Sequence, residues 1–237
     1  MILAPRLACA ASLIASTLIG NASAATRTDT YKVEHPLYGD IGTYVYNFDD
    51  ANGVTRITSQ LHVAITLIGI VIYRQDSDQQ EVLQNGHLIS LKSVTRMNGR
   101  QSTVHGEARD GRFFITAASG TTSAPASVLP SDPWSLKRIG LGVVVSTKSG
   151  KIYNVKVTGG EADTVLLQGM SISARHFRIR TEAQEDKWEV WLDAQGVPIK
   201  FRSLEDGEQI DFILTSTSSR AADTLSPATS PDLRSSP

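Results

Sequence analysis

The sequence predicts an all-β fold: a long-stranded antiparallel meander that forms a strongly curved sheet or an incomplete barrel. Three observations lead to this prediction. Turn dipeptides recur at regular intervals, apolar and polar residues alternate over a long segment, and the distance between turns implies unusually long strands. Each observation is justified below, and the remaining segments are then placed around this sheet.

Turn dipeptides divide residues 79–118 into four segments. Asn or Asp followed by Gly suits a type I′ hairpin turn, because both central residues of that turn need φ > 0. The segments between the turns are rich in Val, Ile, Thr and Ser and contain no proline, which is typical of strands. We therefore expect four consecutive antiparallel strands. The three dipeptides are Asn85-Gly86, Asn98-Gly99 and Asp110-Gly111.

Residues 54–67 alternate with a period of two, which is typical of a half-buried strand. Arg56, His62 and Thr66 fall on the polar face. The phase slips after Gly69, which predicts a bulge or a sharp bend there, and residues 74–78 are expected to form a polar turn. The apolar face carries Ile57, Leu61, Val63, Ile65 and Leu67.

The spacing of the turns predicts a curved sheet. Turns about a dozen residues apart leave strands of roughly ten residues, or about 33 Å at about 3.3 Å per residue. Such strands are nearly twice the usual length, and about eleven of them would coil into a sheet with a concave face. Side chains, a loop or a ligand must fill that face.

Residues 119–142 are expected to form an irregular covering loop, because they contain three prolines and no strand periodicity. One short helix can begin at Pro133, with Asp132 as its N-cap, and at most one or two short helices are expected in the fold. Long loops in compact domains are usually functional or covering elements. This segment is the candidate plug or lid of the concave face.

Residues 143–214 are expected to form a second meander. Registers that keep apolar residues opposite one another bury a continuous face. One such set of registers also gives complementary polar pairs. The predicted polar pairs are Glu182 with Lys187, Arg180 with Glu189, Arg178 with Trp191, His176 with Asp193, Glu189 with Lys200, and Lys200 with Asp211.

The N-terminus is typical of a cleaved signal peptide at residues 1–24. Arg6 precedes a short apolar core, and Ala22-Ser23-Ala24 predicts cleavage after Ala24. A buried N-terminal helix is the alternative. The only cysteine, Cys9, lies within the apolar core, so no lipoprotein is expected. We expect a periplasmic or secreted protein whose mature chain has no transmembrane segment.

Composition sets the domain boundaries. Residues 25–214 are expected to form a single β domain, of which 25–30 are frayed. Residues 215–237 are rich in Ser, Thr and Pro and are expected to be a disordered tail. The net charge of −1 argues against nucleic-acid binding.

No sequence motif indicates catalysis or a cofactor. The five histidines have no metal-ligand spacing, so neither a metal site nor a cofactor is expected. No nucleophile elbow, phosphate loop or dinucleotide fingerprint is present, and no catalytic residue is assigned. A spatial pair of carboxylates, as in a glycosidase, stays open because pairing in space is not visible in sequence.

Several segments together resemble a family of secreted bacterial proteins described only as a domain of unknown function. They are EHPLYGDIGTY, the meander of Asn-Gly turns, APASVLPSDPW, SGKIYNVKVTGGE and WEVWLDAQGVPIKF, within residues 31–214. More distantly, the meander is similar to periplasmic half-barrels of the lipoprotein-carrier type. That resemblance implies a concavity for acyl chains, although this sequence lacks the helices that close it in those folds.

Two groups of candidate site residues follow. His35, Tyr38 and Asp40 form either the polar rim of a ligand mouth or a structural corner set by Pro and Gly. Trp134 either plugs the concave face or stacks on a ligand.

The other group lies on the polar face of the second meander. Trp191 either binds a partner from an exposed position or stacks across the strands on Arg178.

The first functional hypothesis is a non-enzymatic protein that binds or carries an apolar or amphiphilic small molecule. It predicts a cavity of several hundred Å³ lined by aliphatic side chains. The alternative is a structural or interaction protein of the cell envelope with a filled barrel and an envelope protein as its partner. A hydrolase is the least favoured hypothesis.

Overall fold

The computed structural model describes residues 25–136, 141–182, 186–205 and 207–221. In this part of the chain, fifteen strands form one open sheet, with β8 and β9 at its two edges. All neighbouring strands are antiparallel except β9 and β10. The predicted class, a curved antiparallel sheet with almost no helix, is confirmed.

The elements follow one another as a meander. In chain order they are β1 Ala25–His35, β2 Gly39–Ala51, β3 Val54–Leu67, β4 Ile70–Gln84, β5 His87–Met97, β6 Arg100–Arg109, β7 Arg112–Ala117, β8 Gly120–Pro125, β9 Leu129–Pro130, α1 Pro133–Leu136, β10 Leu141–Val145, β11 Ile152–Leu167, β12 Met170–Thr181, β13 Asp186–Leu192, β14 Pro198–Glu205 and β15 Glu208–Ala221.

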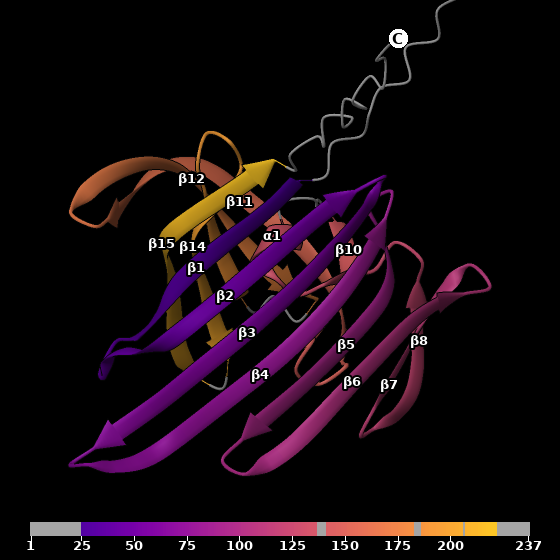
Figure 1. Cartoon of the computed structure of the whole chain (residues 1–237), viewed down its shortest axis with the longest axis horizontal. Helices are drawn as coiled ribbons and strands as arrows, with labels where there is room; N and C mark the ends of the chain where they lie inside the picture. The colour runs from indigo at the N-terminus through magenta and orange to yellow at the C-terminus, as the bar shows by residue number, and fades with distance from the viewer. Residues whose placement is uncertain (1–24, 137–140, 183–185, 206, 222–237) are drawn as a thin grey trace, which may run out of the picture.

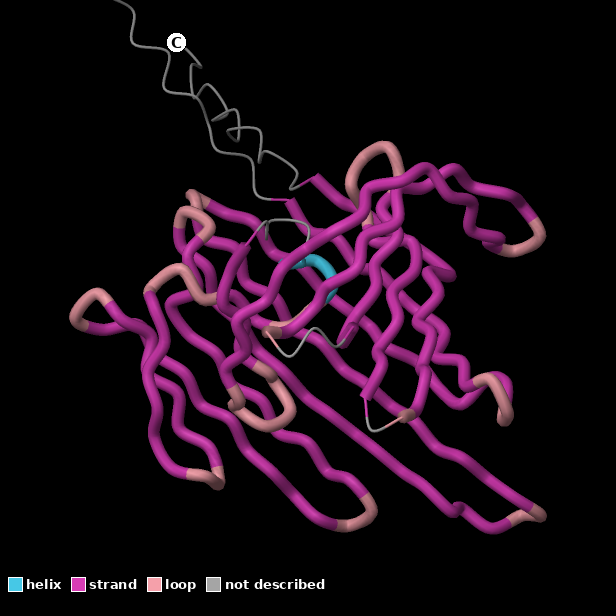
Figure 2. The backbone as a smooth tube through the Cα atoms, turned by 180° about the vertical axis from the view of Figure 1, so that it is seen from behind, coloured by secondary structure: helices cyan, strands magenta, loops and turns pink. Residues whose placement is uncertain are grey.

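The sheet curls back on itself. Figure 1 shows β1 to β6 in front of β10 to β14, and Figure 2 shows α1 enclosed between these halves. The apolar core fills the space between them. Trp134 of α1 is buried there and meets Phe48 edge to face, with 6.4 Å between the ring centroids. The curvature expected from the long strands is therefore present.

The predicted hairpin turns are all present. The Asn and Asp residues at 85, 98 and 110 have φ of about 50°, and each following glycine also has φ > 0. Of the bulge or sharp bend expected at Gly69, the sharp bend is present, because Ile68 and Gly69 form a hairpin turn with φ of 50° and 77°. The expected polar turn at residues 74–78 is wrong, since these residues lie inside β4.

The predicted registers of the second meander differ from the observed ones by two residues. Arg178 faces Glu189, and Trp191 faces His176 on one side and Lys200 on the other. Asp211 faces Arg202. A shift of two keeps every side chain on its expected face, so the pattern of burial is preserved while each pair changes. Residues 183–185 lie outside the described residues.

The ends of the sheet extend further than the sequence suggested. Residues 25–30, expected to be frayed, belong to β1 and pair with both β2 and β15. β15 continues to Ala221, so the expected tail does not begin at residue 215. Main-chain pairing with β1 stabilises this polar segment without an apolar face. The expected signal peptide and residues 222–237 lie outside the described residues.

The covering segment 119–142 is more regular than expected. It contributes β8, β9 and α1, and α1 begins at Pro133 as predicted. The predicted N-cap role of the Asp132 side chain is wrong. Its carboxylate points into the core and accepts hydrogen bonds from Tyr46 and Gln79, at 3.2 and 2.8 Å. The main-chain carbonyl of Asp132 accepts from the Ser135 N–H at 3.0 Å.

Candidate functional site

A cavity of about 480 Å³ lies on the concave side of the sheet. Its walls come from β2 to β5 on one side and from β14 and β15 on the other, together with the β1/β2 turn. The residues that line it are His35, Tyr38, Ile41, Leu61, Val63, Ile65, Ile72, Tyr73, Gln75, Met97, Lys148, Ser203, Glu208, Ile210 and Phe212.

The alternation of β3 builds the apolar wall. Leu61, Val63 and Ile65, which the period of two placed on one apolar face, all line the cavity. Across the cavity, Ile210 and Phe212 present a second apolar surface from β15. These side chains offer a ligand apolar contact from two directions.

A buried histidine marks the polar rim. His35 Nδ1 accepts a hydrogen bond from the Leu37 N–H at 3.1 Å, so Nε2 carries the proton of a neutral ring. That Nε2 lies 2.9 Å from Glu208 Oε2 and donates to it. The half-exposed Tyr38 ring packs against the imidazole, with 4.8 Å between centroids. The rim is thus an ordered group of side chains with one exposed carboxylate.

The other two candidate ligand-binding residues, Asp40 and Trp134, do not line the cavity. Asp40 is exposed, does not line the cavity, and accepts a hydrogen bond from the Gly42 N–H at 3.2 Å. It therefore fits the structural reading of this corner. Trp134 packs in the core and does not line the cavity either, so it fits the reading of a plug.

Sequence reasoning missed most of the lining. Glu208 and Lys148 gave no signal, because each lies in a loop or at a strand end far along the chain from His35. Only the alternation of β3 pointed to the apolar wall.

Residues 39–215 match the model of a family described as a domain of unknown function (DUF6134). The chain belongs to this family. The resemblance to an uncharacterised family is therefore confirmed. A search of curated proteins finds no match.

The DUF6134 domain also resembles solved structures. A beta-barrel-like protein of unknown function (DUF1849) from Brucella abortus aligns with a TM-score of 0.56 and 8% identity, over 83% of this chain and 97% of that chain. At that identity the likeness shows the fold alone. A DUF1329 family protein from Desulfovibrio piger aligns with 8% identity over 87% of this chain and 89% of that chain, but its TM-score of 0.17 supports no argument.

A second polar group is buried inside the DUF6134 domain. The Gln79 side-chain amide donates to Glu81 and to Asp132, at 2.8 Å each. Asp132 also accepts from Tyr44 and Tyr46 at 3.4 and 3.2 Å, whereas no other donor among the described residues reaches Glu81 Oε2, and the two carboxyl groups interact with each other. Burial raises the pKa of both carboxyl groups, that of Glu81 well above its usual value.

The number of donors decides which carboxyl holds the proton. Asp132 accepts three hydrogen bonds and Glu81 accepts one, so we assign the proton to Glu81. A smaller cavity of about 120 Å³ touches Asp132 and the two tyrosines but not Glu81. The pair therefore does not flank a cleft as the carboxylates of a glycosidase do.

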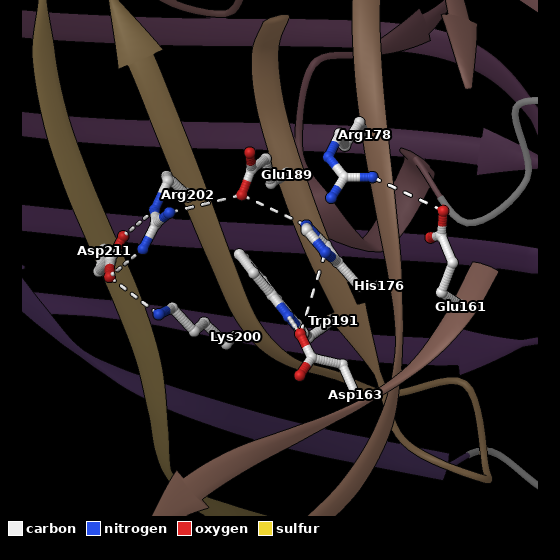
Figure 3. A network of polar contacts seen from close by, with 9 residues as sticks. All are labelled: Glu161, Asp163, His176, Arg178, Glu189, Trp191, Lys200, Arg202 and Asp211. Carbon is white, nitrogen blue, oxygen red and sulfur yellow. Dashed lines mark hydrogen bonds and ion pairs between the residues drawn. The ribbon is translucent and has the colours of Figure 1, made fainter. Parts of the chain in front are cut away.

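Figure 3 shows a third polar group, a ladder of charges on the outer face of β11 to β15. Trp191 stacks on His176 with 4.1 Å between centroids, and its indole N–H donates to Asp163 at 2.7 Å. Arg202 donates twice to Asp211, at 2.6 and 2.9 Å. These contacts join five neighbouring strands, so the ladder stabilises the sheet.

The expected roles of Trp191 and Arg178 change accordingly. Trp191 is only 6% exposed, so it is not the exposed partner-binding tryptophan that one reading proposed. Arg178 does not stack on it but lies 3.7 Å from Glu161. The register shift by two explains both results.

Among the described residues, no group of three or more His, Cys, Asp or Glu side chains is arranged to hold a metal ion. No helix in the same part of the chain has the length and apolar character to cross a membrane.

Proposed function

We propose that this protein binds an amphiphilic small molecule, with its aliphatic part in the concave cavity and its polar end at the rim. The cavity supports the proposal most directly. Its volume of about 480 Å³ falls within the range of about 300–1,000 Å³ that is usual for small-molecule sites.

The chemistry of the lining supports an amphiphile over a polar metabolite. Aliphatic and aromatic side chains form both walls, and the rim carries the hydrogen-bonded pair of His35 and Glu208. An apolar chain between these walls would be removed from water, at roughly 25 cal/mol per Å² of buried surface. The polar rim then fixes the orientation of the other end.

The interior at the end of the sheet that holds His35 does not favour the alternative of a filled barrel. Side chains of Trp134, Phe48 and Tyr46 fill the space around α1, but a cavity remains at the His35 end. The part of the core that is filled supports the sheet, and the part that is hollow is the proposed binding site. We place the protein in the periplasm or outside the cell, and this rests on the N-terminal sequence alone.

A fluorescent apolar probe, N-phenyl-1-naphthylamine, tests the site. We expect the purified protein to bind it with saturable fluorescence enhancement. Ile65→Trp fills the cavity from the β3 wall and should weaken binding at least about tenfold, because an indole occupies space that the probe needs.

The matched control is Thr58→Trp, which adds the same side chain to the exposed face of the same strand. It should bind as the wild type does. Saturable binding that is equal in both variants would place the probe elsewhere, and absence of binding to the wild type would contradict the proposal.

A further inference from the structure

The tip of the β3/β4 hairpin is an exposed apolar surface. Ile68 is 93% exposed, and four other large aliphatic side chains around it are about half exposed or more. No charged residue occurs between His62 and Arg74. We call this group the apolar tip; its members are Leu67, Ile68, Ile70, Val71 and Ile72.

The apolar tip projects beyond the rest of the sheet. β2 pairs with β3 only as far as Val63, and β5 pairs with β4 only as far as Gln75. Residues 64–73 therefore form a two-stranded ribbon that pairs with no third strand, at the lower left of Figure 1. At its base, the main chain of Arg74 still bonds to Asn98 of the next turn, at 2.9 Å. Side chains on both faces of this ribbon are exposed, which is unusual for a strand pair so rich in isoleucine.

The apolar tip is continuous with the cavity. Ile72 belongs to the tip and also lines the cavity. Tyr38 and Met97, both partly exposed, line the cavity beside it from the neighbouring turns. The mouth of the proposed site therefore opens on the same apolar surface.

We propose that the apolar tip inserts into the interfacial region of a phospholipid bilayer and holds the cavity mouth against the membrane. The inference rests on the proposed function, because a bilayer is a reservoir of amphiphilic molecules that can enter such a mouth. A protein partner would cover one face of a hairpin. A lipid surface surrounds a projecting ribbon, and this ribbon is apolar on both faces.

The ribbon also limits how deep the tip can go. Its outer main-chain groups have no neighbouring strand, and unpaired main-chain groups are costly in hydrocarbon. Arg74 lies five residues from Gly69, or about 16 Å along the strand. Its guanidinium pairs with Asp76 at 2.9 Å, and these charges stay at the headgroup level. Insertion by about 5–10 Å places the isoleucines in the boundary region and the ion pair outside it.

Vesicle flotation tests the inference, and the sample is the protein purified from cells, without any further truncation. The vesicles are phosphatidylcholine alone and phosphatidylcholine mixed with phosphatidylglycerol. We expect the wild type to float with both. The double variant Ile68→Ser/Ile70→Ser should lose at least about tenfold in partitioning, because two exposed aliphatic side chains no longer leave water.

The chain offers a matched control in the β11/β12 hairpin. Leu166 and Met170 are 65% and 62% exposed there but do not line the cavity. Leu166→Ser/Met170→Ser should float as the wild type does. Equal loss in both double variants would overturn the inference, and so would wild-type protein that floats with neither vesicle.

A second readout separates this inference from the proposed function. N-phenyl-1-naphthylamine binding is measured without vesicles, and the tip variant should keep it. A wild type that floats but binds no probe would contradict the ligand site and leave the tip as a membrane contact. A wild type that binds probe but does not float would contradict the membrane contact alone.

Discussion

The buried carboxyl pair governs how single residues respond to pH. Glu81 lies in the core, where its only hydrogen-bond donor among the described residues is the Gln79 amide, and Asp132 shares that amide and interacts with Glu81. Because burial raises the pKa of Glu81, the folded state holds its proton at pH values where the unfolded state has released it. This group therefore stabilises the fold less as pH rises.

The sign of that effect gives a prediction. Above the ordinary glutamate pKa of 4.5, the folded state binds more protons than the unfolded state. Glu81 should therefore lower the free energy of unfolding as pH rises, by up to about 1.4 kcal/mol per pH unit for its one proton, until the pH passes its folded-state pKa. Glu81→Gln removes the titrating group, so its urea unfolding should show a flatter pH dependence and greater stability at neutral pH.

Asp211 serves as a control, because its pKa is lowered whereas that of Glu81 is raised. Arg202 and Lys200 lower the pKa of Asp211 against the effect of burial, so its contribution is lost only as pH falls below 3.8. Asp211→Asn should change acid stability and leave the slope above pH 4.5 unchanged. If the free energy of unfolding of Glu81→Gln fell with pH above 4.5 as steeply as that of the wild type, the assignment of the proton to Glu81 would be refuted.

Individual residues show where sequence reasoning stops. Asp132 before Pro133 has the local signature of an N-cap, yet its side chain turns inward because Gln79 and two tyrosines from other strands converge on it. The sequence around Asp132 cannot indicate that convergence, because its partners are far away along the chain. His35 and Tyr38 could be placed at one corner because Pro and Gly confine the chain there, but the sequence left open whether that corner faces a cavity; both residues line it.

Among the elements, the β2/β3 pair shapes the cavity wall. Gly42 faces Val63 beside the irregularity at residues 33–34 of β1. A Cβ atom on Gly42 would lie 1.9 Å from the main-chain oxygen of His62. A main-chain atom cannot rotate away, so only a displacement of the strands would relieve this clash.

Gly42→Ala should therefore destabilise the fold by about 1–3 kcal/mol or more, as insertion of a methyl group into a packed site does. The measurement is urea denaturation followed by circular dichroism. Thr43→Ala, at the next and exposed position of β2, should change stability by less than about 0.5 kcal/mol. Equal effects of the two alanines would mean that the strands separate easily at this point.

Hairpins were predictable where their turn chemistry was explicit. The Asn-Gly and Asp-Gly turns were found. At Gly69 the sequence indicated a bulge or sharp bend but not a hairpin turn, and the Gln168-Gly169 turn was missed, because Ile and Gln seldom adopt φ near 50°. The registers failed by two residues for a related reason. Alternation fixes the face of a strand but is unchanged by a shift of two, so only the turn geometry could have fixed each pair.

At the scale of the whole molecule, strand length determines shape. Long antiparallel strands coil, and the fifteen strands wrap around a core that fills one end and leaves the other hollow. The sequence predicted the curvature and the aliphatic lining of one wall. It could not predict the opposite wall, because β14 and β15 reach the cavity only when the open sheet curls back on itself.

The central claim is that this hollow end holds an amphiphilic molecule. Native mass spectrometry of protein purified from cells under non-denaturing conditions tests it most directly, with Ile65→Trp and Thr58→Trp prepared in parallel. We predict a discrete added mass on the wild type and on Thr58→Trp that is lost from Ile65→Trp. Bare protein mass in all three samples, or an adduct that Ile65→Trp retains, would contradict the account.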